Sequence, residues 1–200
     1  HLAKLGYVKD ADWVEYEIPV PEQPNETMER IAALAEKRYK LHLLRAKKKK
    51  ELLPFAKSLF ELINVAYEPL YGVVHLSQKQ MDRYVKQYFG FIRPEFVPVV
   101  LDEDEKMVAF GVTMPSLSKA LQRCGGRLWP FGFLHLLGAL KRNDRADLYL
   151  VAVHPDYQGR GVGRQLLQMT ERRIKEAGGE RIYVDTSQRI QYASTRAFYE

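Results

Sequence analysis

The stretch between Asp147 and Ala177 constrains the fold more than any other part of this 200-residue chain. Residues 148–153 form an unbroken apolar run of strand length, which is typical of a strand buried on both faces. After Pro155, apolar residues return at helical spacing, and Gly178 follows as the stop expected beyond a helix end. The stretch therefore predicts a buried strand, a glycine-rich loop and an amphipathic helix in succession.

The loop between this strand and this helix carries the clearest binding signal. Glycine allows positive φ and a close approach to a ligand, so that successive amide groups can point into one concavity. First-turn amides lack helical partners, the helix dipole is positive at this end, and two arginines add charge. We therefore predict a diphosphate site formed by Gln158, Gly159, Arg160, Gly161, Val162, Gly163 and Arg164.

Spacing separates the nucleotide-binding motifs that this loop could represent. A P-loop is excluded because Gly163 is followed by Arg164 and Gln165 and not by Lys and Ser or Thr. A Rossmann site gains support from Asp185 at the end of the next predicted strand, but its third glycine would fall at Arg164. Five residues also separate the strand from the glycines, where that fold turns at once. An ordinary strand-to-helix connector is the other alternative.

A third interpretation is a resemblance. Gln158, Gly161 and Gly163 match the Gln/Arg-x-x-Gly-x-Gly/Ala motif of the GNAT superfamily of acyl-CoA N-acyltransferases. The segments VHPDY at 153–157 and RAFYE at 196–200 resemble the flanking GNAT segments in the right order. The resemblance covers about residues 41–200. It implies an α+β, GNAT-like fold with a central mixed, mostly antiparallel sheet flanked by helices.

The same resemblance implies an N-acetyltransferase that uses acetyl-CoA, or another acyl-CoA, and a small-molecule or peptide amine as acceptor. Backbone amides of Val151, Ala152 and Val153 would meet the thioester carbonyl and the pantetheine arm. Tyr199 stands where the family places its general acid, and a phenol with an ordinary pKa of about 10 is protonated at neutral pH. The alternative is a non-catalytic acyl-CoA-binding or scaffold domain.

The general base is the least defined member of the expected site. Asp147, at the start of the central strand, matches a carboxylate base of some relatives and would act directly or through water. His154 and Tyr149 are alternatives, and Asp147 could equally be a solvated charge. The family helix before Tyr199 often carries an asparagine where this chain has Tyr192, so part of the usual coenzyme contact is changed.

The two ends of the chain stand in an unusual order. After Phe-Tyr-Glu a GNAT domain continues with a Leu-Gly-Phe/Tyr corner and two closing strands, whereas here Leu5-Gly6-Tyr7 and the alternating residues 14–18 precede the domain. We predict a fragment of a tandem-GNAT protein. Residues 1–20 would be the C-terminal remnant of a preceding GNAT-like unit, 21–40 a linker and connecting helix, and 41–200 an N-acetyltransferase domain lacking its final strands.

Such a fragment would have an open sheet edge, which exposes backbone groups and favours association into homo-oligomers. The alternative is that the N-terminal strand folds back into the missing place. Within the main domain we predict a first strand at 41–46, a hairpin from 96–101 and 107–114, and an insertion at 115–144. This insertion either walls an acceptor pocket or thickens the core, and the apolar residues 128–140 predict a buried or lid-like helix.

Composition limits the remaining partners. A net charge of +6 and a pI near 9.3 favour anionic ligands, but the lysine run at 47–50 has no aromatic platform, so nucleic acid is an unlikely partner. Cys124 is the only cysteine, no signal segment opens the chain, and no apolar stretch reaches membrane-span length. We expect a cytoplasmic protein without a membrane partner or a metal.

Overall fold

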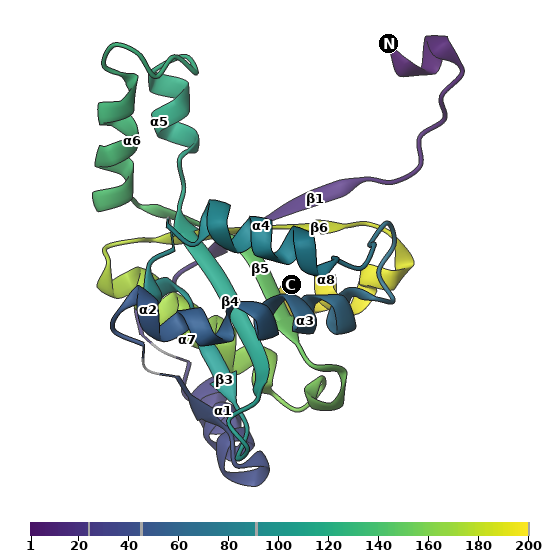
Figure 1. Cartoon of the computed structure of the whole chain (residues 1–200), viewed down its shortest axis with the longest axis vertical. Helices are drawn as coiled ribbons and strands as arrows, with labels where there is room; N and C mark the ends of the chain where they lie inside the picture. The colour runs from purple at the N-terminus through teal and green to yellow at the C-terminus, as the bar shows by residue number, and fades with distance from the viewer. Residues whose placement is uncertain (24, 45, 91, 200) are drawn as a thin grey trace.

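Six strands form one sheet in the order β1-β6-β5-β4-β3-β2 among residues 1–23, 25–44, 46–90 and 92–199, which the computed structural model describes (Figure 1). All neighbouring strands are antiparallel except β5 and β6, which run parallel. The mixed, mostly antiparallel sheet predicted from the sequence is thus confirmed. The strands are β1 (Trp13–Pro19), β2 (His42–Leu43), β3 (Val99–Leu101), β4 (Met107–Pro115), β5 (Arg145–Val153) and β6 (Arg181–Ser187).

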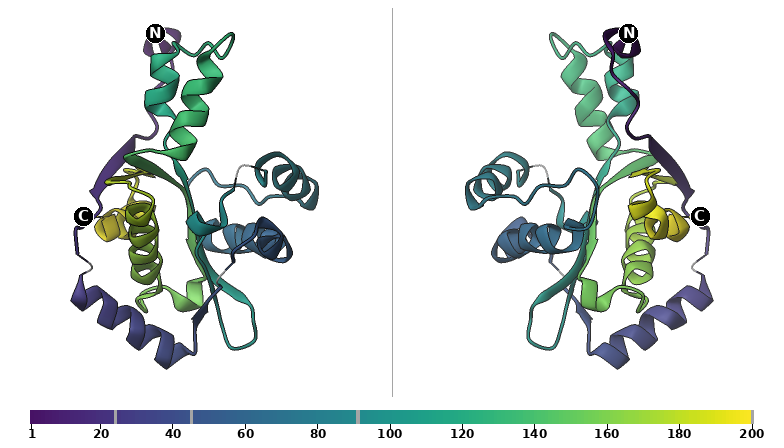
Figure 2. Two further views of the ribbon diagram at one scale, coloured as in Figure 1. Left: turned by 90° about the vertical axis from the view of Figure 1, so that its left-hand side faces the viewer. Right: turned by 90° about the vertical axis from the view of Figure 1, so that its right-hand side faces the viewer.

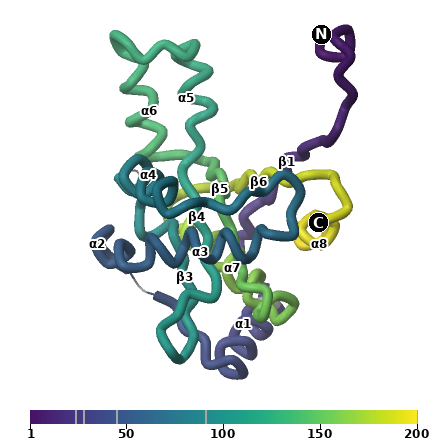
Figure 3. Tube along the Cα trace, turned by 45° about the vertical axis from the view of Figure 1, so that its right-hand side comes forward, coloured from purple at the N-terminus to yellow at the C-terminus, as the bar shows by residue number. Residues whose placement is uncertain are grey.

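Helices cover both faces of the sheet: α3 and α4 lie on one side, α7 and α8 on the other (Figure 2). The helix α1 packs against α7 near the lower end of the molecule (Figure 3). The α-helices are α1 (Glu26–Tyr39), α2 (Lys49–Leu52), α3 (Ala56–Tyr67), α4 (Gln78–Tyr88), α5 (Ser118–Arg123), α6 (Gly132–Lys141), α7 (Val162–Glu176) and α8 (Ala193–Tyr199). The 3₁₀ turns are Leu2–Leu5, Leu53–Phe55, Pro94–Phe96, Pro155–Tyr157 and Ile190–Tyr192.

The predicted strand, loop and helix after Asp147 are all present. Residues 148–153 are the greater part of β5, and α7 follows the loop. Every fourth residue of α7 faces the sheet, because this spacing returns to the same side of a helix. These buried residues are Val162, Leu166, Thr170 and Ile174. Gly178, with φ +83°, ends the helix, and a Cβ at Gly179 would lie only 2.5 Å from Ile174 Cγ2.

Two apolar layers enclose the sheet. On one face, Leu62, Ile63 and Ala66 of α3 pack against Phe110 and Val112 of β4. On the other face, α7 packs against β3 to β6 through residues that include Val100, Ala109, Leu148 and Ile182. The predicted hairpin of 96–101 and 107–114 corresponds to β3 and β4. The β2 strand lies within the predicted strand at 41–46, of which Arg45 is outside the described residues, as is Glu200 at the end of the motif RAFYE.

The prediction of an open sheet edge beside β6 is wrong. β1 pairs antiparallel with β6 over seven residue pairs, from Trp13–Ser187 to Pro19–Arg181. Tyr16 and Ile18, on one face of β1, contact the apolar layer under α7, and this half-buried alternation fixes the strand in place. The N-terminal strand therefore occupies the position that the sequence left empty. An origin of residues 1–20 in a preceding unit stays a prediction, without the argument from a vacant edge.

The inserted residues form a hairpin of two helices, α5 and α6, that stands away from the sheet (Figures 1 and 2). Trp129 and Phe131 at its apex are 83% and 69% exposed, and α6 also exposes Phe133, Leu134 and Leu137. Of the two alternatives for residues 128–140, the buried helix is wrong, because apolar spacing alone does not show whether a partner covers a helix. The lid-like helix stays a prediction. The insertion does not thicken the core, and a role in acceptor binding stays a prediction.

Candidate acyl-transfer site

The central feature of the site is the divergence of β5 from β6. Within the described chain these strands pair only at Arg145–Arg181, Ala146–Ile182 and Asp147–Tyr183. β5 then continues along β4, while β6 continues along β1. The register between β4 and β5 shifts where Tyr149 has no opposite residue, and such a bulge bends a strand. The second half of β5 therefore has a backbone edge that is not paired with β6.

Alternate residues of β5 present their backbone groups to this gap. The His154 amide donates to the Val108 carbonyl at 2.8 Å. In an antiparallel pair, every second residue bonds to the neighbouring strand, so this bond shows which residues of β5 face β4. Two residues earlier, Ala152 is therefore bonded to β4, and its side chain is buried. The polar groups of Val151 and Val153 face the gap. Of the three residues predicted to contact the coenzyme, Val151 and Val153 direct backbone groups into the gap, whereas Ala152 directs its own toward β4; the contact with the coenzyme stays a prediction.

Two side-chain hydrogen bonds support this orientation. The Tyr67 hydroxyl donates to the Val151 carbonyl at 2.8 Å, and Gln158 Nε2 donates to the Val153 carbonyl at 3.0 Å. Neither carbonyl could accept these bonds if it faced β4. The bond from Gln158 also ties the beginning of the glycine loop to the end of β5. Strand and loop thus form one continuous backbone surface.

The glycine loop reaches α7 through the 3₁₀ turn Pro155–Tyr157. Gly159 and Gly161 have φ values of +69° and +87°, a region that only glycine adopts without appreciable strain. Gly161 is the N-cap of α7, so the amides of Val162 and Gly163 begin the helix without intrahelical acceptors. The Val162 side chain is fully buried and leaves only its backbone for a ligand.

The helix α1 packs directly against this loop. A Cβ at Gly161 would lie 2.9 Å from Ile31 Cγ2, so the close approach of α1 requires glycine in addition to the positive φ. Gln165 Nε2 donates to Glu36 Oε1, and this bond fastens α1 to the first turns of α7. The segment predicted as a linker and connecting helix is therefore part of the wall around the loop.

Positive charge surrounds the beginning of α7. The Arg160 guanidinium lies 5.0 Å from the ring centroid of Tyr39 and 5.9 Å from that of Tyr157, distances at which a cation is attracted to an aromatic face. Arg164 follows in the first turn of α7. Two guanidinium groups and a helix N-terminus at one position favour an anion such as a diphosphate.

The helix α8 brings Tyr199 to the gap. Its neighbour Phe198 contacts the start of α7, where a Cβ at Gly163 would lie 3.4 Å from the Phe198 ring. Tyr199 packs 6.1 Å from Tyr16, centroid to centroid. Burial raises the pKa of Tyr199 well above its ordinary value, and the Tyr67 hydroxyl raises it further. Tyr67 and Tyr199 belong to helices on opposite faces of the sheet and meet at the diverging strands.

Asp147 occupies the last paired position of β5 with β6. Burial raises the pKa of this carboxyl, and the charge of Asp185 raises it too, while hydrogen bonds from Ser116 and Tyr149 oppose the shift. A raised pKa makes a carboxylate a better proton acceptor near neutral pH. Tyr199 and Asp147 have different neighbours, so the two predicted catalytic groups lie in separate surroundings.

The alternative bases have other contacts. His154 Nδ1 accepts a hydrogen bond from the Asp156 amide at 3.3 Å and so caps the turn before the glycine loop. Tyr149 lies at the bulge, and burial followed by the charge of Asp147 raises its pKa. Tyr192, in the place of the family asparagine, is buried and donates to the Tyr71 carbonyl at 3.2 Å. We retain Asp147 as the candidate base.

Among the described residues, His, Cys, Asp and Glu side chains do not gather in threes as they would around a metal ion. None of the helices in that part of the chain has the length and apolar character needed to cross a membrane.

The sequence model of the Acetyltransferase (GNAT) family matches residues 56–200. The chain belongs to the GNAT family. The matched region contains α3, the diverging strands, the glycine loop and α8, so the GNAT resemblance seen in the sequence is confirmed. GNAT domains use acetyl-CoA as co-substrate, and membership supports acetyltransferase activity in general. No curated protein matches the sequence.

Solved structures agree with the GNAT fold. A GCN5-related N-acetyltransferase from Sphaerobacter thermophilus aligns with a TM-score of 0.56 and 11% identity, over 94% of this chain and 46% of that chain. A GCN5-related glucosamine N-acetyltransferase region of a fungal multi-domain GH3 β-N-acetylglucosaminidase aligns with a TM-score of 0.58 and 14% identity, over 98% and 20%. This chain thus spans less than half the length of either, and at these identities the likeness shows the fold alone.

A third structure is closer in length. A putative acetyltransferase of the GNAT family from Desulfovibrio desulfuricans aligns with a TM-score of 0.50 and 20% identity, over 80% of this chain and 81% of that chain. It again supports the fold, whereas the acceptor of this GNAT protein has to be inferred from its own residues.

Sequence reasoning missed two residues of the site. Tyr67 and Ile31 lie on apolar helical stripes, and this pattern assigns both to packing. The hydroxyl of Tyr67 instead binds the backbone of β5, and Ile31 sets the space beside Gly161. The only signal for Tyr67 was its position near the end of a helix, where its hydroxyl group could reach a partner. The second had none, because the contact joins residues 130 positions apart.

Proposed function

We propose that this GNAT protein is an acyl-CoA-dependent N-acetyltransferase that transfers an acetyl group to an amine. The observation that carries the proposal is the unpaired edge of β5, where the backbone groups of Val151 and Val153 face the gap and lead directly into the glycine loop. A pantetheine arm needs such a row of backbone partners, and a diphosphate needs the loop that follows. No other part of the described chain combines the two.

The coenzyme would be held almost entirely by backbone. The amides of residues 159–163 and the side chains of Arg160 and Arg164 would bind the diphosphate, since the loop glycines allow the required positive φ and the helix dipole favours the anion. The amides of Val151 and Val153 would bind pantetheine and polarise the thioester carbonyl, as donors do in an oxyanion hole.

The chemistry requires one proton acceptor and one proton donor. The amine nitrogen attacks the thioester carbon, a C–N bond forms and the C–S bond breaks. Asp147, directly or through water, accepts the proton that the amine loses, and Tyr199 donates a proton to the departing thiolate. The burial that raises the pKa of Tyr199 keeps it protonated over the whole physiological range.

The acceptor is a small-molecule or peptide amine that approaches Asp147. Asp185 adds negative charge near Asp147 and Arg145 adds positive charge, so the carboxylate of Asp147 itself is the group that would attract the amine in its protonated form. This electrostatic preference does not distinguish among amines.

Titration calorimetry with acetyl-CoA, followed by free-thiol release with a panel of amines, tests the proposal. We expect binding, and thiol release with at least one amine. Binding without release on any amine would support the alternative, a non-catalytic acyl-CoA-binding or scaffold domain. Absence of binding would contradict both functions.

A further inference from the structure

The α5–α6 hairpin exposes far more large apolar surface than a solvent-facing element needs. Trp129 and Phe131 at the apex are 83% and 69% exposed. Contiguous patches of this kind mark contact surfaces. The other exposed apolar side chains of the hairpin, between 41% and 53% exposed, are Leu121, Leu128, Phe133, Leu134 and Leu137.

The hairpin also accounts for most of the protein's net positive charge. Residues 116–143 contain no Asp or Glu but five lysines and arginines, which leaves only +1 for the other 172 residues of a chain whose total is +6. An apolar apex flanked by cations therefore projects from a body that is nearly neutral. The five cations are Lys119, Arg123, Arg127, Lys141 and Arg142.

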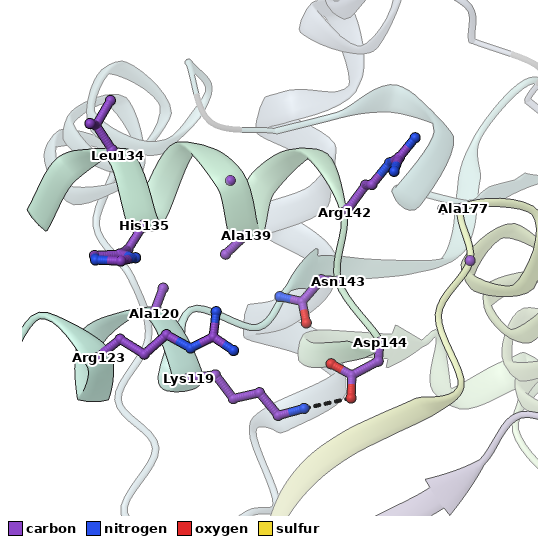
Figure 4. A pocket seen from close by; sticks show the side chains of 12 residues that line it. Lys119, Ala120, Arg123, Leu134, His135, Ala139, Arg142, Asn143, Asp144 and Ala177 are labelled. Atoms are coloured by element: carbon purple, nitrogen blue, oxygen red, sulfur yellow. Dashed lines mark hydrogen bonds and ion pairs between the residues drawn. The ribbon is translucent and has the colours of Figure 1, made fainter.

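Three of these cations, Lys119, Arg123 and Arg142, line a cavity of about 620 Å³ between α5 and α6 (Figure 4). Lys119 pairs with Asp144 at 2.6 Å, so its charge is largely offset. Arg123 extends from α5 into the space opposite His135 of α6. Among the described residues neither Arg123 nor Arg142 is ion-paired with a carboxylate, and both remain available to external anions.

The length of the hairpin suits docking on the surface of a lipid bilayer. The ten residues of α6 span about 15 Å, while interfacial segments bury their apolar side chains about 5–10 Å deep. At that depth Trp129 and Phe131 would lie at the boundary of the acyl chains, and Arg127 in the apical loop would lie among the headgroups, with Arg123 next to them at the end of α5. Lys141 and Arg142, at the base of the hairpin, remain close enough to add long-range attraction.

We propose that the α5–α6 hairpin docks this protein on the surface of an anionic lipid bilayer, with Trp129 and Phe131 inserted and the arginines on lipid phosphates. The sequence-based expectation of no membrane partner considered only spanning segments. A second copy of this hairpin fits poorly, because two segments that each keep a net positive charge, even with Lys119 paired to Asp144, would face each other. Protruding aromatic side chains next to arginine are typical of interfacial anchors.

Vesicle sedimentation tests the proposal. The protein is mixed with vesicles of phosphatidylcholine alone and with vesicles in which about a quarter of the lipid is phosphatidylglycerol. We expect binding to the anionic vesicles that weakens as salt rises, and much weaker binding to the neutral ones. In a Trp13→Phe background, the Trp129 emission should shift to the blue when anionic vesicles are added, because the indole leaves water.

Variants separate the two contributions. Trp129→Ser with Phe131→Ser should weaken partitioning by at least about tenfold, and Arg123→Gln with Arg127→Gln should remove most of the preference for anionic lipid. Ile190→Ser, at an apolar side chain that is 81% exposed outside the hairpin, is the matched apolar control. Lys79→Gln with Arg83→Gln on α4 is the matched charge control.

Loss of vesicle binding in the hairpin variants but not in the controls would support the proposal. Four results would overturn it: no binding to either vesicle, equal binding to both, equal loss in hairpin and control variants, or a dimer in solution that Trp129→Ser dissociates. Acetyl-CoA titration of the same hairpin variants should give the wild-type affinity, so a failure here is distinct from a failure of the proposed enzyme activity.

Discussion

The coenzyme side and the chemistry side of the proposed site are constructed differently. The coenzyme side is one continuous segment, from Val151 to Arg164, and acts through its backbone. The chemistry side collects single side chains from separate elements: Tyr67 from α3, Asp147 from β5 and Tyr199 from α8. A backbone site depends on φ values that local glycines permit, whereas a side-chain site depends on how distant elements pack. Mutations on the two sides should therefore fail in different ways.

The largest effect is expected on the coenzyme side. Gly161→Val should abolish acetyl-CoA binding, with a loss of more than about a hundredfold in affinity, because a branched residue resists the positive φ with which Gly161 directs the first amides of α7 toward the coenzyme. The contact with Ile31 now predicts a lower melting temperature as well. Calorimetry and thermal unfolding measure the two effects separately.

Two further variants distinguish binding from stability. Gly159→Val imposes the same backbone strain of about 1–3 kcal/mol, but a Cβ there meets nothing within 4 Å, so its melting temperature should fall less than that of Gly161→Val. Adding Ile31→Ala to Gly161→Val should recover part of the stability and none of the binding. Unchanged affinity in folded Gly161→Val would remove the loop from the coenzyme site.

The same contrast explains what the sequence could predict. The strand, loop and helix after Asp147 could be predicted because their signals, the spacing of apolar residues and the positions of glycines, all lie within about 30 consecutive residues. The place of β1 beside β6 was not fixed in advance, since that pairing joins residues far apart. The choice between a buried and a lid-like α6 was left open for another reason: an apolar stripe shows that a partner is needed but not whether the fold supplies it.

On the chemistry side, Asp147→Asn should have the larger effect. Loss of a general base lowers turnover by about 10²–10⁴-fold, measured as the initial rate of thiol release, with little change in acetyl-CoA affinity. Because activity requires the carboxylate, the wild-type rate should rise with pH through a pKa above the ordinary aspartate value. Ser116→Ala should have a smaller effect. It removes one of the hydrogen bonds that lower the pKa of Asp147, so the rise of the rate should move to higher pH.

Asp147→Asn should also make the protein more stable at neutral pH. The pKa of Asp147 is raised in the folded state, so its stabilising contribution is complete below the unfolded pKa and is lost as pH rises through the folded value. At neutral pH the half-buried carboxylate therefore lowers the free energy of unfolding, and asparagine removes that effect. An unchanged rate together with a lower melting temperature would identify Asp147 as a structural charge.

Tyr199→Phe should lower turnover by roughly 10–10²-fold and leave acetyl-CoA affinity nearly unchanged, since it removes the proton donor and keeps the ring. The raised pKa of Tyr199 adds a test by pH: the wild-type rate should show no alkaline decline from loss of this proton below about pH 10. Full turnover in Tyr199→Phe would leave Tyr199 a packing role beside Tyr16.

The smallest effect concerns the contact between the two sides. Tyr67→Phe removes the donor to the Val151 carbonyl and should cost about 1–3 kcal/mol of stability, because a buried carbonyl loses its partner. Tyr192→Phe is the matched control, since it removes a comparable bond that goes to the Tyr71 carbonyl and not to β5. If Tyr67 orients the edge that binds pantetheine, Tyr67→Phe should weaken acetyl-CoA binding several-fold and Tyr192→Phe should not. Equal affinities in the two variants would show that the backbone of β5 holds its orientation without help from α3, and the coenzyme side would then be independent of the chemistry side.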